Sequence, residues 1–205
     1  MTDKFTVYLV DDDPGVLKGL SRLLSARGYE VKPYSSPRVF LDEHDIAVPG
    51  CVVLDVSMPG PDGLEIQHVL TAAGGLSRPV VFVTGKGDIP TSVRAMKAGA
   101  IDFLTKPVKE QDLIEALSRA EARDAESRRI QSERESVKAK IRRLTPREHE
   151  VLTHVVAGRL NKQIAGELGT VEKTIKVHRS RMMEKLGVRT VADLVRMSEK
   201  LDALK

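Results

Sequence analysis

Five short apolar runs, separated by stretches of helical pattern, constrain the fold of this chain most strongly. Each run spans four or five residues between turn-forming residues, and the runs lie at Thr6–Val10, Glu30–Tyr34, Cys51–Asp55, Val80–Thr84 and Ile101–Leu104. Amphipathic stretches such as Pro14–Ala26 and Gly63–Ala73 lie between them. Alternating strands and helices predict an α/β doubly wound, five-stranded parallel sheet with helices on both faces. Right-handed crossovers leave few topologies, and we expect the flavodoxin-like strand order 2-1-3-4-5.

Helix boundaries are signalled by local residue chemistry. Asp13-Pro14 and Ser36-Pro37 each predict an N-cap followed by Pro in the first turn. A helix should begin near Lys109 and continue, because residues 109–143 lack Gly and Pro and are dense in good helix formers. Apolar residues thin out after Leu117, which favours a solvated helical spacer. A partial coiled coil is the alternative, with a seam through Ile130, Val137 and Leu144.

The last part of the chain predicts an all-α bundle of four short helices. Thr145-Pro146-Arg147-Glu148 has the pattern of a capping box, and that helix should end at Gly158. The second helix is expected over Asn161–Leu168. The third should be capped by Thr170, run to Leu186 and stop at Gly187, and the fourth should start near Thr190. We therefore predict domains at 1–120 and 143–205, with a helical linker at 121–142.

Charge is distributed unevenly along the 205 residues, although the net charge is only +4. Residues 1–119 hold 13 Lys and Arg against 16 Asp and Glu, whereas residues 144–205 hold 12 against 8. A basic end is typical of nucleic-acid binding. The single cysteine, Cys51, excludes an intramolecular disulfide and a thiolate metal cage, and we expect it in the core. No long apolar segment begins the sequence, so we expect no signal peptide and a cytoplasmic protein.

Polar residues follow several of the predicted strands where the strands end. In a parallel sheet these ends share one edge, and ligands bind there at the switch in strand order. The residues concerned are Asp11, Asp12, Asp55, Thr84 and Lys106. Clustered carboxylates repel one another, and Mg²⁺ relieves that repulsion through oxygen ligands. A neutralised carboxylate can attack phosphorus, while Lys106 offsets phosphoryl charge and Thr84 donates to a phosphoryl oxygen.

Each of these residues alone is more often structural, and we assign Asp13 only to helix capping. Together they match a known pattern. The stretches "VYLVDDD", "VVLDVSMPGPDG", "VVFVTGKGD" and "GAIDFLTKP" make residues 5–119 resemble the receiver domain of bacterial two-component response regulators. The resemblance implies that Asp55 accepts a phosphoryl group from a sensor histidine kinase. It also implies a Mg²⁺ (or Mn²⁺) site formed by Asp12, Asp11 through water, Asp55 and the Ser57 carbonyl.

The same resemblance implies a switch. Thr84 and Lys106 would contact the phosphoryl group, the peptide bond before Pro107 would be cis, and Phe103 would follow Thr84 inward on phosphorylation. The surface that changes is the one through which relatives form homodimers, with Val93, Met96 and Lys97 as contacts. Lys86 and Ser57 lie where the family tunes the lifetime of the acyl phosphate.

The third helix of the basic end has the pattern of a DNA-recognition helix. Ile175, His178, Met182 and Leu186 form an inward stripe, with His178 half-buried. A helix-turn-helix inserts the opposite face into the major groove. The residues expected to meet bases there are Lys173, Lys176, Val177, Ser180 and Arg181. Those expected to contact phosphates are Lys162, Thr174 and Arg179.

Residues 144–188, "LTPREHEVLTHVVAGRLNKQIAGELGTVEKTIKVHRSRMMEKLGV", resemble the LuxR-type helix-turn-helix. With the receiver, the chain resembles response regulators of the FixJ/NarL type, closest to the FixJ branch. This implies a phosphorylation-activated transcriptional regulator, not an enzyme, that binds double-stranded promoter DNA as a homodimer and meets RNA polymerase. One alternative is a Mg²⁺-dependent aspartyl-phosphate phosphatase, although such enzymes carry Asp-x-Asp where this chain has Asp55-Val56-Ser57. A pseudo-receiver that works without phosphate is the other.

Overall fold

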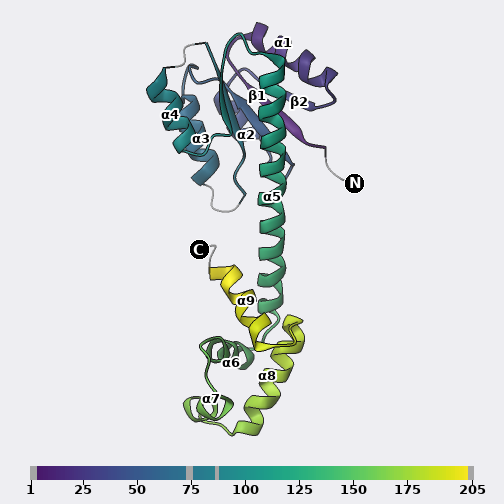
Figure 1. Cartoon of the computed structure of the whole chain (residues 1–205), viewed down its shortest axis with the longest axis vertical. Coiled ribbons are helices and arrows are strands. Elements are labelled where there is room, and N and C mark those ends of the chain that lie inside the picture. The colour runs from purple at the N-terminus through teal and green to yellow at the C-terminus, as the bar shows by residue number, and fades with distance from the viewer. Residues whose placement is uncertain (1–3, 73–75, 86–87, 203–205) are drawn as a thin grey trace. The chain divides into compact units, whose positions relative to one another are not determined.

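The computed structural model describes residues 4–72, 76–85 and 88–202. The chain divides into two compact units, residues 1–129 and 130–205, and Figure 1 draws the elements of both. In the part of the chain that is described, no helix is both long and apolar enough to cross a membrane.

The first unit is built on a five-stranded parallel sheet in the order β2-β1-β3-β4-β5. Its strands are β1 (Thr6–Val10), β2 (Glu30–Tyr34), β3 (Gly50–Leu54), β4 (Val80–Thr84) and β5 (Asp102–Thr105). The predicted fold and strand order are confirmed. Because β1 and β3 are neighbours while β2 lies at the edge, the chain reverses its direction of winding between these two central strands.

Two strands begin and end one residue away from their predicted positions. The strand predicted at Cys51–Asp55 is Gly50–Leu54, because Gly50 already pairs with Thr6 of β1 and Asp55 lies just beyond the ladder. The strand predicted at Ile101–Leu104 is Asp102–Thr105, in which Thr105 pairs with Thr84. In both cases pairing with the neighbouring strand, which composition does not show, decides where the strand begins and ends.

Helices cover both faces of this sheet (Figure 1). They are α1 (Pro14–Ala26), α2 (Pro37–Glu43), α3 (Gly63–Ala72), α4 (Ile89–Lys97) and the first part of α5 (Glu110–Arg142). One apolar cluster joins Phe40 of α2 and Ile66 of α3 to one face, and another joins Leu24 of α1 and Leu117 of α5 to the other. Cys51 is fully buried in the second cluster, as expected.

Of the two N-caps predicted in this unit, one is confirmed and the other is wrong in part. Asp13 caps α1 through its side chain, which accepts from the backbone N–H groups of Gly15 and Val16. Ser36 occupies the N-cap position of α2, but its side chain makes no capping hydrogen bond, so that part of the prediction was wrong. The start of α2 relies instead on the fixed φ of Pro37 and on Phe40 N–H donating to the Ser36 carbonyl.

Helix α5 is continuous for 33 residues, as the absence of Gly and Pro predicts. Its buried positions in the first unit are Leu113, Ala116, Leu117, Ala120 and Asp124. The interpretation of residues 121–142 as a solvated spacer is therefore wrong at Asp124, whose carboxylate faces protein rather than water. Composition suggested exposure because charged residues are usually solvated, and only tertiary contacts show this exception.

The second unit contains the end of α5 with α6 (Pro146–Val156), α7 (Asn161–Glu167), α8 (Glu172–Leu186) and α9 (Val191–Asp202). Its core includes Val151, Ile164, Ile175, Met182 and Leu194. The capping box of Thr145 and Glu148 is confirmed, and Gly187 ends α8 in the left-handed conformation. The predicted cap Thr170 is wrong: its N–H closes the turn after α7 onto the Ala165 carbonyl, so α8 begins after Val171.

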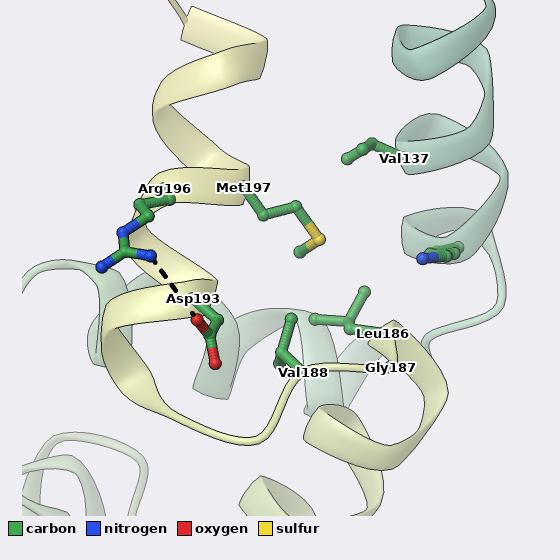
Figure 2. Close-up of a pocket in the computed structure, with 8 residues that line it drawn as sticks. Val137, Leu186, Gly187, Val188, Asp193, Arg196 and Met197 are labelled. Atoms are coloured by element: carbon green, nitrogen blue, oxygen red, sulfur yellow. Dashed lines mark ion pairs between the residues drawn. The ribbon is translucent and has the colours of Figure 1, made fainter.

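The end of α5 packs within this second unit. Val137 of α5 faces Leu186, Val188 and Met197 across a pocket (Figure 2). The pocket has a volume of about 300 Å³. Leu144 also packs against the core of the unit. Two of the three residues of the suggested coiled-coil seam, Val137 and Leu144, therefore lie against the helical unit itself.

Candidate functional site

Two acids are buried where the central strands end. Asp11 follows β1 and Asp55 follows β3, and they are only 4% and 5% exposed. The two strands are neighbours and parallel, with Val10 paired to Leu54, so the residues that follow them emerge side by side. The Asp55 N–H donates to the Val10 carbonyl at 2.9 Å, which fixes its backbone at the end of the ladder.

Lys106, which follows β5, brings a cation to both acids. Its Nζ lies 2.6 Å from Asp11 Oδ2 and 3.0 Å from Asp55 Oδ1. Burial by itself lowers the pKa of Lys106, but the hydrogen bonds and charges of the two carboxylates outweigh burial and raise that pKa. The ammonium therefore stays charged, and one lysine faces two acidic side chains. Such a site favours a further cation.

The remaining carboxylate oxygens are held by backbone groups. The Asp13 N–H donates to Asp11 Oδ1 at 2.9 Å, and the Ser57 N–H donates to Asp55 Oδ2 at 2.8 Å. Asp12 is exposed and is not brought into this group. Among the residues described, no cluster of three or more His, Cys, Asp or Glu side chains is arranged to hold a metal ion. The atoms that could bind a metal here are carboxylate and carbonyl oxygens, which are the ligands that a hard divalent cation prefers.

Gly63 allows the loop after Asp55 to fold back closely. A Cβ at this position would lie 2.6 Å from the Asp55 carbonyl oxygen and 2.9 Å from a ring carbon of Phe82. The Gly63 N–H instead donates to the Val56 carbonyl at 3.1 Å. Glycine here lets the loop from Asp55 return close to the end of β3 as α3 begins.

The other residues predicted for the pocket lie near it. Thr84 is 1% exposed at the end of β4, and the peptide bond between Lys106 and Pro107 is cis, as expected. Phe103 is partly buried, and its ring centroid lies 6.0 Å from that of Phe82. Lys86 lies outside the described residues. On α4, Val93 and Met96 are 43% and 46% exposed, so the predicted dimer contacts are on the surface.

In the second unit, α8 has the two faces that the sequence predicts. Ile175, Met182 and Leu186 are fully buried, and His178 is half-buried. The residues expected to meet DNA bases are all exposed: Lys173, Lys176, Val177, Ser180 and Arg181. An exposed cationic helix face with an apolar contact point is suited to the major groove.

Two of the residues expected at this face have protein partners. Arg179, predicted to contact phosphate, donates from Nη1 to Asn161 Oδ1 at 2.9 Å, which links α8 to the start of α7. The Lys176 Nζ lies 3.0 Å from Glu172 Oε1. Sequence analysis missed Glu172, although an acid four residues before a lysine on a helix is the usual signal for such a pair. Lys162 is exposed.

Sequence analysis also missed a buried ion pair behind α8. Glu148 of α6 is 2% exposed, and the Lys185 Nζ of α8 donates to its Oε2 at 2.6 Å. The same oxygen accepts from the Thr145 N–H at 2.8 Å. The Lys185 hydrogen bond, with the backbone N–H of Thr145, holds the pKa of Glu148 below its usual value. Glu148 was predicted only as half of a capping box, but it also fixes α8 to α6.

Comparison with known proteins places both units in established families. Residues 7–118 match the family described as response regulator receiver domain, and residues 142–198 match the bacterial regulatory proteins of the luxR family. Response regulator protein TmoT of Ectopseudomonas mendocina is 44% identical over 97% of this chain and 90% of its own. Transcriptional regulatory protein FixJ of Azorhizobium caulinodans is 39% identical over 97% of this chain and 93% of its own.

A solved structure of the response regulator StyR is also similar to the chain. It has a TM-score of 0.81 and 46% sequence identity, and the similarity covers 96% of this chain and 99% of that one. The fold and site thus define a two-domain signalling protein with a receiver and a LuxR-type DNA-binding domain. The chain belongs to the response regulators of the FixJ/NarL type, a family of transcriptional regulators.

Proposed function

We propose that Asp55 is the phosphoacceptor and that its phosphorylation activates DNA binding by the second unit. The observation that carries this proposal is the buried group of Asp11, Asp55 and Lys106, in which one lysine faces two carboxylates. If the lysine formed only a structural ion pair, one acid would be enough to balance its charge. A second buried acid beside the same lysine suits the binding of a further cation.

The chemistry is a phosphoryl transfer from a phosphohistidine of a sensor kinase. A carboxylate oxygen of Asp55 attacks phosphorus, the N–P bond breaks, and the bonding pair returns to the imidazole of the donor, leaving an acyl phosphate on Asp55. Lys106 lies 3.0 Å from Asp55 Oδ1, where it offsets the charge that the incoming phosphoryl group adds. Thr84, at the end of the adjacent strand β4, supplies a hydroxyl to the same region.

A divalent cation, Mg²⁺ or Mn²⁺, is part of this proposal. Asp11, Asp12, Asp55 and the Ser57 carbonyl would hold it, and when bound it supplies charge neutralisation to the phosphoryl oxygens. Asp11 and Asp55 are already adjacent through Lys106, whereas Asp12 is exposed at the rim. The residues that face the pocket therefore match the cation in chemistry.

Phosphorylation would change the surface of α4 and β5. Phe103 is partly buried beside Phe82, and its neighbour in the sheet is the strand that ends in Thr84. Inward movement of Thr84 would leave room for Phe103 to follow. Val93, Met96 and Lys97 on α4 would then form a homodimer contact, and two copies of α8 would bind two half-sites of promoter DNA.

In this function the phosphoryl group is a signal rather than a product. The partners are a sensor histidine kinase, double-stranded promoter DNA, a second copy of the chain and RNA polymerase, and the site of action is the cytoplasm. Lys173, Lys176, Val177, Ser180 and Arg181 would meet base edges, while Lys162 and Thr174 would contact phosphates. Arg179 would reach a phosphate only by leaving Asn161.

The test is phosphoryl labelling of the full chain by acetyl phosphate with Mg²⁺. We expect stable incorporation into the wild-type chain and none into Asp55→Asn, since the amide nitrogen and oxygen cannot form an acyl phosphate. Asp42→Asn is the control, because Asp42 is an exposed acid on α2 away from the pocket. Labelling of Asp55→Asn at the wild-type level would refute the assignment.

A further inference from the structure

Residues 119–141 lie between the segments that match the two families, 7–118 and 142–198. Two of these residues nevertheless make dense contacts in the first unit. Asp124 is 3% exposed and the Arg128 side chain is 20% exposed, although both belong to the segment that joins the domains. They continue the buried stripe of α5 beyond Ala120 at intervals of four residues, on one face of the helix.

Arg128 binds the loop of residues 46–48, whose backbone carbonyl groups lie outside any strand or helix. Its Nη1 donates to the Ala47 carbonyl at 2.7 Å. Its Nη2 donates to the Ile46 and Val48 carbonyls at 2.9 and 2.7 Å. The remaining donor, Nε, lies 2.7 Å from Asp124 Oδ2. One guanidinium thus holds three consecutive carbonyls and one carboxylate, a use of the planar fork that lysine cannot reproduce.

Asp124 extends this contact to the strand that carries the phosphoacceptor. Its Oδ2 accepts from the Gly50 N–H at 3.2 Å, and Gly50 is the first residue of β3. A Cβ on Gly50 would lie 2.2 Å from the Thr6 carbonyl oxygen, so only glycine allows β3 to start this close to β1. The amino end of β3 is therefore held by β1 on one side and by α5 on the other.

A second arginine, which is buried, completes the group. Arg78, just before β4, is 1% exposed and donates to the Val48 carbonyl at 2.8 Å and to the Asp45 carbonyl at 2.6 Å. Its guanidinium carbon lies 4.9 Å from the centroid of the Tyr8 ring. We call the group of residues 45–50, Arg78, Asp124 and Arg128 the clasp. Breaking a buried charge network costs more than breaking a surface pair.

The clasp lies at the opposite end of β3 from Asp55. A strand of five residues at about 3.3 Å per residue spans roughly 17 Å. The apolar contacts of α5 with the sheet end at Ala120, so without the clasp the helix would be free from that point. With the clasp, α5 belongs to the body of the first unit as far as Arg128.

We propose that Asp124 and Arg128 are positioning residues for signal output: they bind the linker helix to the amino end of the phosphoacceptor strand, so that the change caused by phosphorylation is passed along α5 instead of being lost at a flexible joint. This inference rests on the proposed phosphorylation of Asp55. A helix that is fixed to its domain transmits the movement of that domain, whereas a frayed one acts as a flexible tether.

The test measures how much acetyl phosphate raises the specific DNA affinity of the full chain, in wild type and in Arg128→Ala. We expect the variant to incorporate phosphate at the wild-type rate, because the clasp does not touch the pocket, but its stimulation of DNA binding should fall by about fivefold or more. Hydrogen exchange at the Gly50 amide should become faster. Arg129→Ala is the matched control, since Arg129 forms its ion pair with Glu126 on the exposed face of α5.

Arg128→Lys and Asp124→Asn test the same idea with smaller disturbance, in case the alanine variant folds poorly. Both keep a polar group in place, and both should reduce the stimulation while phosphate incorporation stays constant. The inference would be overturned if acetyl phosphate raised the DNA affinity of folded variants as much as that of wild type, although their Gly50 amide exchanged faster. The clasp would then be broken with no effect on signal output. A wild-type chain that accepts no phosphate, or that is not stimulated by it, would overturn the proposed function and this inference together.

Discussion

The buried group of Asp11, Asp55 and Lys106, called the pocket below, and the exposed face of α8 are both rich in charge, but they hold their charges in different ways. In the pocket, Lys106 contacts two carboxylates whose side chains are 6% exposed. On α8, the Lys176 side chain is 64% exposed and pairs with Glu172 of the same helix. Water screens exposed charges far more than buried ones. Substitutions in the pocket should therefore have large, coupled effects, and those on α8 smaller and nearly additive ones.

The largest expected effect is that of Lys106→Ala on the first unit. Without the ammonium, Asp11 and Asp55 repel each other in a buried site, and we expect a loss of about 3 kcal/mol at pH 7 without divalent cations. The three tyrosines, Tyr8, Tyr29 and Tyr34, all lie in the first unit, so urea unfolding followed by tyrosine fluorescence reports this unit alone.

Two comparisons sharpen the Lys106 experiment. Adding Asp55→Asn to Lys106→Ala should restore much of the lost stability, because only one buried carboxylate remains. Lys18→Ala, at an exposed lysine of α1, should change stability by less than about 0.5 kcal/mol. If the loss of stability in the double variant equals the sum of the losses in the two single variants, Lys106 and Asp55 do not interact energetically, which would contradict this prediction.

A smaller effect is expected for Glu148→Gln in the second unit. The amide keeps the hydrogen bond from the Thr145 N–H but loses the charge that faces Lys185. Since the Lys185 side chain is 33% exposed, solvent reduces the cost to about 2 kcal/mol. Circular dichroism should show earlier unfolding of helix without any change in the tyrosine transition. Glu150→Gln, which removes a surface pair with Arg147, should cost less than about 0.5 kcal/mol.

The Glu148 pair also predicts a pH dependence. Its folded-state pKa is lowered from the usual value of 4.5, mainly by the hydrogen bond from Lys185. The stabilisation is therefore complete above about pH 4.5 and is lost as the pH falls through the lower, folded-state pKa. The difference in stability between wild type and Glu148→Gln should shrink in that acidic range. A difference that stays constant from neutral pH down to pH 3 would rule out this assignment.

The smallest effect is expected on α8. Lys176→Ala removes one candidate base contact and should weaken specific DNA binding by about tenfold, with little change in non-specific binding. Gel shifts with the operator and with unrelated DNA measure both. Lys138→Ala on α5 is the matched control, because Lys138 also pairs with an acid on its own helix, Glu135. If Lys176→Ala binds the operator with unchanged affinity, Lys176 does not contact bases in the major groove.

Local patterns predicted much of the structure. The alternation of strands and helices, the capping box of Thr145 and the buried stripe of α8 each follow from periodicity or from residues close together in the chain. The pocket residues Asp11, Asp55 and Lys106 could be predicted because parallel strands bring their carboxyl ends together. Strand order thus predicts which strand ends meet, but it did not predict that Asp12 stays exposed outside the group.

Interactions between distant segments were not predictable in the same way. Gly50 was left outside the predicted strand, because its role depends on the distance to Thr6 in the adjacent strand. Asp124 and Arg128 look like ordinary residues of a charged helix, and their partners lie about 80 residues earlier in the chain. The pair of Glu148 and Lys185 was hidden for the same reason. Composition predicts solvation for charged residues, and only the fold reveals those that are buried.

The most direct test of the account is the oligomeric state and DNA footprint of the full chain with and without beryllofluoride and Mg²⁺. Beryllofluoride mimics the phosphoryl group on Asp55 without chemical turnover. We predict a monomer without it, and with it a dimer that protects two half-sites at lower protein concentration. An identical mass and footprint in both conditions, in a chain that binds beryllofluoride, would contradict the claim that the pocket controls DNA binding.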